Sequence, residues 1–127
     1  MTPIRSLVTA MAGLLTATLA HADLTIGVSA SLTGPTSALG IPTKNGIALW
    51  PKEIAGEKLN VILLDDATDP TVAVKNTRRF ITEDKVDVIV GSVATPVAAA
   101  MSDVATEGQT VQLMLSPVVL PEGKGAW

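Results

Sequence analysis

The chain has 127 residues with a formal net charge of −3 at pH 7, no cysteine, no tyrosine and one histidine, His21. The commonest general base, the thiolate nucleophile and the soft metal ligands are therefore nearly absent, which argues against an enzyme and against a metal or cofactor site. The mildly acidic balance and the scattered basic residues argue against binding of nucleic acid or of an anionic membrane surface.

Residues 1–22 have the features of a secretory signal peptide. Arg5 supplies the positive start, an apolar run follows over 7–20, and Ala20-His21-Ala22 fits a cleavage site between small residues. This run is shorter than the roughly 20 residues that cross a bilayer, which favours cleavage over a retained anchor. We expect cleavage after Ala22 and a mature domain over 23–127; the loss of Arg5 brings its net charge to −4.

Four short apolar runs in the mature chain predict buried β-strands. They cover residues 24–30, 59–64, 86–90 and 111–115, and each ends in a turn of small, hydroxyl-bearing or acidic residues. The last residues, 118–127, have no periodicity and are predicted to be a loop.

Three helices are predicted between the strands. The first runs from Gly40 to about Leu49, with a kink or a second short turn over 51–55. The second begins at Pro70 with Asp69 as its N-cap and ends near residue 84. The third follows Thr95 as N-cap and ends at Gly108.

This alternation predicts an α/β fold: a parallel sheet of strand order 2-1-3-4, with helices on its faces and right-handed crossovers. In that order the sheet reverses its direction of growth between the first and third strands. Open α/β sheets bind ligands in the crevice at such a point. The turns 29–40 and 91–96 line this crevice and are the predicted site.

Two residues of the second turn, Ser92 and Thr95, have chemistry suited to a ligand. Their hydroxyl groups, together with free N–H groups at a helix N-terminus, could hold a carboxylate, which the helix dipole also favours. Thr95 could equally do no more than cap its helix. Ser92 is too far from the helix to be its ordinary cap.

The acidic turn Asp65-Asp66-Ala-Thr-Asp69 has two interpretations. The carboxylates could form a divalent-cation site or an acidic pocket like that of receiver domains. We favour the interpretation that they cap a helix and solvate the end of a strand, because adjacent carboxylates rarely chelate a cation without further ligands. The chain also lacks the glycine-rich motifs that cradle phosphates.

Four segments, in this order, resemble the substrate-binding proteins of branched-chain amino-acid ABC importers. They are 26–35 (IGVSASLTGP), 64–70 (LDDATDP), 73–79 (AVKNTRR) and 84–91 (DKVDVIVG). The resemblance extends from Leu24 to about Pro117. It implies one lobe of a two-lobe type I periplasmic binding protein, which closes on an amino acid and delivers it to permease subunits at the membrane.

In such proteins the turns after the third and fourth strands hold the ligand's carboxylate and ammonium groups. By position these turns are Ser92 to Thr95, which includes Ala94, and the run that contains Ser116 and Val118. Leu39 stands where the family often has an aromatic residue over the ligand, and Leu120 replaces a hydroxyl-bearing residue. These two departures suggest a changed ligand, such as another small apolar acid or amide.

The resemblance predicts a periplasmic solute-binding component of an ABC importer that binds a branched-chain or related small amino acid or amide. The chain stops at Trp127 before the first sheet is complete, so we expect a partial N-terminal lobe with weak binding of its own and an exposed apolar edge beside the fourth strand. The alternative is an exported α/β enzyme, or a receptor or sensor lobe, that uses Asp65, Asp66 and Ser92.

Overall fold

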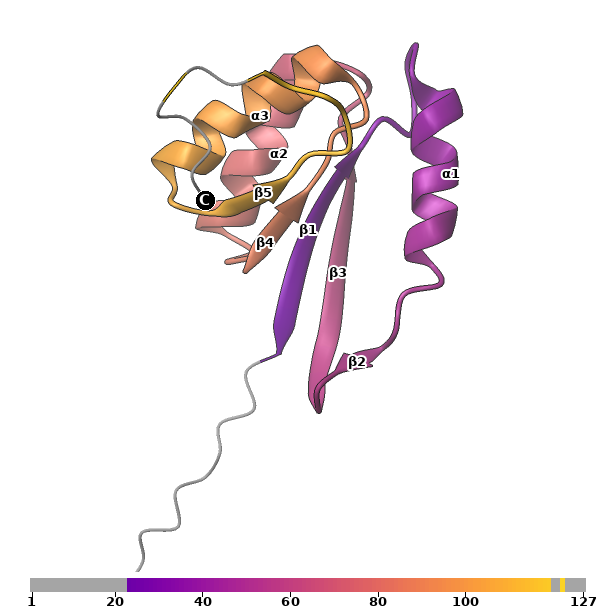
Figure 1. The fold of residues 1–127 in the computed structure, drawn as a ribbon, viewed down its shortest axis with the longest axis vertical. Coiled ribbons are helices and arrows are strands. Elements are labelled where there is room, and N and C mark those ends of the chain that lie inside the picture. The colour runs from indigo at the N-terminus through magenta and orange to yellow at the C-terminus, as the bar shows by residue number, and fades with distance from the viewer. Residues whose placement is uncertain (1–22, 120–121, 123–127) are drawn as a thin grey trace, which may run out of the picture.

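A computed structural model describes residues 23–119 and residue 122, so the predicted signal peptide lies outside the described residues. The described part forms one five-stranded sheet with three helices (Figure 1). In chain order the elements are β1 (Leu24–Ala30), α1 (Ser37–Ile47), β2 (Glu53–Ile54), β3 (Glu57–Asp65), α2 (Pro70–Thr82), β4 (Val88–Val90), α3 (Thr95–Glu107) and β5 (Val111–Leu113).

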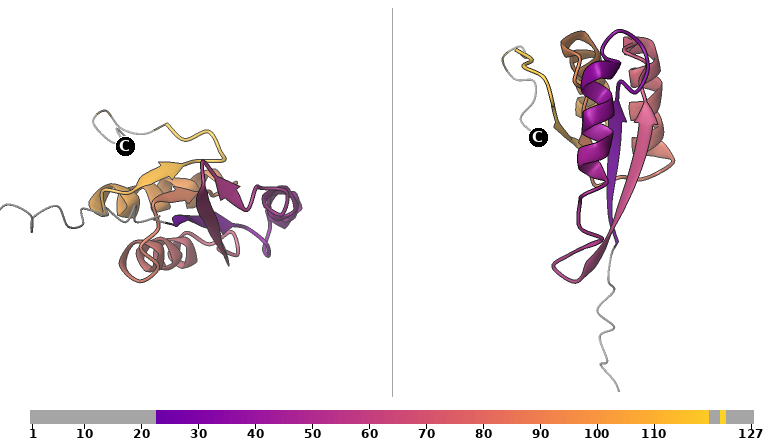
Figure 2. Two further views of the ribbon diagram at one scale, coloured as in Figure 1. Left: turned by 90° about the horizontal axis from the view of Figure 1, so that it is seen from below. Right: turned by 90° about the vertical axis from the view of Figure 1, so that its right-hand side faces the viewer.

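The sheet order is β2-β3-β1-β4-β5, in which β3, β1, β4 and β5 run parallel to one another and β2 is antiparallel to β3. The predicted order 2-1-3-4 of the four long runs is therefore confirmed. From β1 the chain moves in one direction through α1 to β3, and then in the other through α2 to β4 and α3 to β5. Right-handed crossovers accordingly place α1 on one face of the sheet and α2 with α3 on the other (Figure 2).

The main core lies between the sheet and the pair α2 and α3. Phe80 of α2 is fully buried and lies directly on β1, where a Cβ at Gly27 would approach its ring to 2.7 Å. This position of β1 therefore needs a residue without a side chain. The buried cluster around Phe80 contains Ala73, Val86, Ile89, Ala94, Val97, Met101 and Ala105.

On the other face α1 lies beside the carboxyl end of β1, with Gly40 as its buried residue. On β5 the side chains of Val111 and Leu113 are 37% and 56% exposed, and Leu115 beyond the strand is 43% exposed. β5 is also the outer strand of the described sheet. The expected exposed apolar edge beside the fourth predicted strand is therefore present. No helix in residues 23–119 is long and apolar enough to cross a membrane.

The segment after α1 differs from the prediction. Instead of a kinked helix or a short turn over 51–55, the chain forms an antiparallel hairpin between β2 and β3. Ala55 and Gly56, which connect these strands, have positive φ angles of 53° and 88°. Positive φ at both central residues is the condition for a tight two-residue hairpin turn, so Gly56 marks a turn and not the end of a helix.

The first helix begins at Ser37, and not at Gly40 as predicted, so that Pro42 lies inside it. We attribute this earlier start to a contact with a distant part of the chain. The hydroxyl groups of Thr36 and Thr68 lie 2.9 Å apart and fix the loop just before the helix. The third and fourth predicted strands are also shorter than expected, since β4 begins at Val88 and β5 ends at Leu113.

Candidate functional site

The carboxyl ends of the parallel strands meet at one edge of the sheet, toward which the arrowheads of β1 and β3 point in Figure 1. Three turns follow these ends: 31–36 after β1, 66–69 after β3 and 91–94 after β4. This is the position at which parallel α/β sheets hold their ligands. The predicted pair of turns is therefore brought together, with the acidic turn after β3 beside them.

Asp65 ties the turn after β1 to the turn after β3. One of its carboxylate oxygens accepts from the amides of Leu32, Thr33 and Ala67 at 2.8–3.2 Å, and the other accepts from the Thr33 hydroxyl at 2.6 Å. Burial alone raises the pKa of Asp65, but the Thr33 hydroxyl and three backbone amides stabilise the charged form more, so the pKa lies below its usual value. The charged carboxylate of Asp65 thus links the turn after β1 to the turn after β3.

Asp66 is fully buried beneath the same turns. Its Oδ1 accepts from the Ser31 hydroxyl at 2.7 Å and from the Thr68 amide at 3.0 Å, and its Oδ2 accepts from the Ser29 hydroxyl at 3.0 Å. A buried carboxylate is tolerated where hydrogen bonds compensate its desolvation, as they do here.

Asp69 caps α2, as predicted. Its Oδ1 accepts from the amides of Thr71 and Val72 at 2.6 and 3.2 Å. Together the three aspartates hold loops and cap a helix, which is the interpretation favoured from the sequence. No group of three His, Cys, Asp or Glu side chains within the described residues is arranged to hold a metal ion.

The turn after β4 is held from three sides. The Ser92 Oγ, fully buried, lies 3.4 Å from the Ser31 Oγ, and the Ser92 carbonyl accepts from the Ser116 hydroxyl at 3.2 Å. The Gln112 amide donates to the carbonyls of Gly91 at 2.9 Å and Ala98 at 3.2 Å. Side chains from the turn after β1, from β5 and from the segment after β5 thus fix where this turn lies.

The N-terminus of α3 differs from the prediction. Ala94, and not Thr95, is the N-cap, and no side chain among residues 23–119 caps the helix. Thr95 is the first helical residue and is exposed, so Pro96 lies at the second helical position, where its missing N–H is still not needed. The first turn of α3 therefore keeps backbone donors without a side-chain acceptor, beside an exposed hydroxyl group.

The predicted site residues fall into two groups. Ser92, Ala94 and Thr95 share one turn, to which Ser116 is hydrogen-bonded. Leu39 is 58% exposed on α1, and Val118 is half-buried in the segment after β5. Leu120, where the family's hydroxyl was expected, lies outside the described residues.

Sequence reasoning did not identify Ser31, Asp66 and Gln112 as partners of this turn. Ser29 and Ser31 alternate along one apolar strand and are both buried, which is the pattern that could have indicated an internal acceptor. Their acceptor is 35–37 residues away along the chain, so only the register of the sheet shows it.

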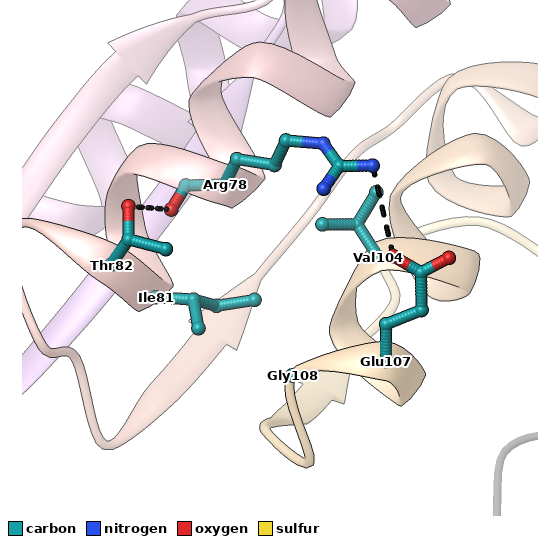
Figure 3. Close-up of a pocket in the computed structure, with 6 residues that line it drawn as sticks. All are labelled: Arg78, Ile81, Thr82, Val104, Glu107 and Gly108. Carbon is teal, nitrogen blue, oxygen red and sulfur yellow. Dashed lines mark hydrogen bonds and ion pairs between the residues drawn. The ribbon is translucent and has the colours of Figure 1, made fainter.

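A separate cavity of about 190 Å³ lies between α2 and α3, lined by residues that include Ile81, Val104 and Gly108 (Figure 3). Arg78 and Glu107 form an ion pair of 3.6 Å at this cavity, with both side chains more than half exposed. Since Glu107 ends α3, the cavity lies at the opposite end of that helix from Ala94 and is not part of the candidate site.

Residues 23–126 match the family model described as periplasmic binding protein. Among curated relatives, the Leu/Ile/Val-binding protein BraC3 of Rhizobium johnstonii is 40% identical over 115 residues, which cover 86% of this chain and 30% of the relative. A Leu/Ile/Val-binding protein homolog of Brucella melitensis is 37% identical, with 80% and 28% covered. The chain thus spans less than a third of these relatives' length.

Solved structures agree on the fold. The Rhodopseudomonas palustris protein Rp1789 is 46% identical with a TM-score of 0.80, covering 84% of this chain and 30% of that one. A leucine-binding protein of Thermotoga maritima is 27% identical with a TM-score of 0.72, with 80% and 30% covered. A solute-binding protein of an R. palustris ABC transporter, solved with 3,4-dihydroxybenzoic acid, is 29% identical with a TM-score of 0.68, with 74% and 27% covered.

The matched relatives are binding proteins. In this chain the acidic turn supports loops, and the turn before α3 keeps backbone donors without a side-chain acceptor. The chain belongs to the periplasmic binding protein family, with the α/β architecture of its type I members.

Proposed function

We propose that this chain forms part of the solute site of an exported component of an ABC importer, and that the solute is a branched-chain or related small amino acid. The observation that carries the proposal is the uncapped N-terminus of α3, which lies beside the exposed Thr95 at the carboxyl edge of the sheet. Donors at a helix N-terminus and a nearby hydroxyl group are suited to a carboxylate.

The apolar part of the solute has a candidate partner in Leu39, whose side chain is 58% exposed near the start of α1. An exposed leucine at this edge of the sheet offers an aliphatic contact and no charge. This chemistry agrees with relatives that are named as Leu/Ile/Val-binding proteins. In this proposal Ser92, Ala94, Ser116 and Val118 shape the turns around the ligand.

An aromatic carboxylic acid is the second candidate solute. The related R. palustris solute-binding protein was solved with 3,4-dihydroxybenzoic acid. Both solute classes carry a carboxylate, so the open end of α3 serves either one. They differ in the ammonium group and in the shape of the apolar part.

The remaining steps of the proposal concern the cell. Residues 1–22 direct export and are removed after Ala22, the protein works in the periplasm, and permease subunits at the membrane receive the solute. No part of this requires nucleic acid or a cofactor.

The test is calorimetric titration of the protein purified from the periplasm. Leucine, isoleucine and valine are compared with 3,4-dihydroxybenzoate, and leucinol serves as a leucine analogue without the carboxylate. We expect weak binding of the amino acids by this chain, as for a partial lobe, and still weaker binding of leucinol. Binding of the benzoate alone would establish the second candidate, and binding of no carboxylate would overturn the proposed function.

A matched pair of variants tests the role of α3. Thr95→Val removes the exposed hydroxyl at the start of the helix, while Thr106→Val removes a hydroxyl near its end that donates to the Ser102 carbonyl. Loss of one hydrogen bond to a charged group should raise the dissociation constant of leucine about tenfold in Thr95→Val. Thr106→Val should leave it unchanged.

A further inference from the structure

A chain of buried polar side chains runs from the turn after β3, through the turn after β1, to the turn after β4. Asp66, Ser31 and Ser92 have no exposed surface. The Ser31 hydroxyl lies 2.7 Å from Asp66 Oδ1 and 3.4 Å from Ser92 Oγ, so it stands between the carboxylate and the turn. Polar groups buried to this degree fix one geometry when they are satisfied.

The direction of these hydrogen bonds follows from the number of protons. A carboxylate only accepts, so the single hydroxyl proton of Ser31 is directed at Asp66. Ser31 therefore faces Ser92 with a lone pair, and Ser92 is the donor across the 3.4 Å contact. The Ser92 oxygen is left to accept from the Ala94 amide, at 3.5 Å. Both distances are long for hydrogen bonds, so each interaction adds little to the free energy of unfolding. Its main effect is on the orientation of the turn.

Ser92 lies two residues before Ala94, which occupies the N-cap position of α3 without a side chain that can cap the helix. The other side chains that anchor the turn, those of Ser116 and Gln112, donate to its backbone carbonyls. Ser31 contacts the Ser92 side chain, which faces the interior of the molecule. The direction in which the first amides of α3 point thus depends on a residue of a different turn, the one after β1.

We propose that Ser31, anchored by Asp66, is a positioning residue for solute binding: it holds Ser92, and with it the 92–95 turn, so that the amides at the start of α3 stay aimed at the solute carboxylate. This inference rests on the proposed function and adds a residue that does not itself touch the solute.

Ser29 provides a matched control. It lies in β1, two residues before Ser31, is also fully buried, and its hydroxyl also donates to Asp66, at 3.0 Å. Among the described residues its hydroxyl makes no hydrogen bond to the 91–95 turn. A purely structural role predicts the same consequences for Ser29→Ala and Ser31→Ala, whereas a positioning role predicts that they differ.

The experiment compares the wild-type protein, Ser29→Ala and Ser31→Ala by three measurements. We expect similar decreases in melting temperature for both variants. Hydrogen exchange of the Ala94, Thr95 and Val97 amides should be about tenfold faster in Ser31→Ala and unchanged in Ser29→Ala, since one steering contact is lost. The dissociation constant of leucine should rise about fivefold in Ser31→Ala alone, with a smaller preference for leucine over leucinol.

Each outcome decides a different question. Equal exchange rates and equal affinities in the two variants would overturn the positioning role and leave the proposed function intact. If the wild-type protein binds no carboxylate, the proposed function fails, while the exchange rates still decide whether Ser31 holds the turn. Should Ser31→Ala not fold, Ser92→Ala removes the same contact from the other side and is compared with Ser29→Ala in the same way.

Discussion

Two turns at the same edge of the sheet treat their backbone donors in opposite ways. The turn before α2 contains three aspartates, and Asp69 accepts from two amides at the start of that helix. The turn before α3 has Ala94 at the equivalent place and no capping side chain. The difference teaches that the protein closes a helix end where it needs support and leaves one open where a solute is proposed to bind.

Charge separates the two turns further. A carboxylate that approaches the acidic turn meets Asp65 and Asp69, whereas the turn over 91–94 contains no charged residue. Like charges repel at short range in a partly buried site. The acidic turn is therefore unsuited to a carboxylate group, while the turn before α3 carries no charge that would oppose one.

The largest effect is expected from removing the acceptor at the centre of the closed turn. Asp66→Ala leaves two buried hydroxyls and the Thr68 amide without their acceptor, so the free energy of unfolding should fall by about 3 kcal/mol. Asp66→Asn, which keeps one acceptor oxygen, should lose about half as much. Urea denaturation measures both, and a loss below about 1 kcal/mol in Asp66→Ala would contradict the role of this carboxylate.

Exchanging the capping states of the two helices tests the comparison itself. Asp69→Ala removes the cap of α2 and should lower the free energy of unfolding by about 1 kcal/mol without changing the affinity for leucine. Ala94→Ser introduces a cap at α3 and should weaken leucine binding severalfold, because the new hydroxyl competes for the same amides. Thermal unfolding measures the change in stability, and calorimetry measures the affinity for leucine. Loss of leucine binding in Asp69→Ala would refute the separation of a supporting turn from a binding turn.

A smaller effect is expected from Asp65, and it depends on pH. Its pKa is lower in the folded protein, so its contribution is present above the unfolded value of about 3.9 and is lost as the pH falls through the folded pKa. The free energy of unfolding of the wild type should exceed that of Asp65→Asn by a constant amount from pH 5 to 7, and the difference should shrink below about pH 4. A difference that grows toward low pH would have the wrong sign.

The smallest effect is expected far from both turns. Arg78 and Glu107 are 60% and 68% exposed, so Arg78→Ala should change the free energy of unfolding by less than about 0.5 kcal/mol. The affinity for leucine should not change. A clear loss of affinity in this variant would show that the two ends of α3 are coupled.

The sequence predicted those parts of the fold that depend on local signals. Apolar runs of five or more residues located the parallel strands, and Asp69 before Pro70 located the start of α2. The hairpin at β2 was missed because a two-residue strand has no periodicity and because Ala55 adopts a positive φ that alanine rarely takes. The start of α1 depends on the contact between Thr36 and Thr68, which lie 32 residues apart.

The site was predicted only as far as its turns. Ser92 and Thr95 were identified because they follow a strand and precede a helix, but which of them is buried depends on the packing of β1 and β5 around them. The capping role fell to Ala94, and no residue preference could have indicated an alanine there. The partners of Ser92 come from other strands, so their identity depends on register.

Gly40 is a point of close packing in α1, and the residues on either side of it are exposed. A Cβ at this position would lie 2.0 Å from the Ser31 carbonyl oxygen, whereas Leu39 and Ile41 on either side are 58% and 49% exposed. Any side chain at position 40 would displace the helix, whereas substitutions at positions 39 and 41 would leave its packing unchanged. A library that aims at new solute preferences should therefore randomise positions 39 and 41 and keep the glycine between them.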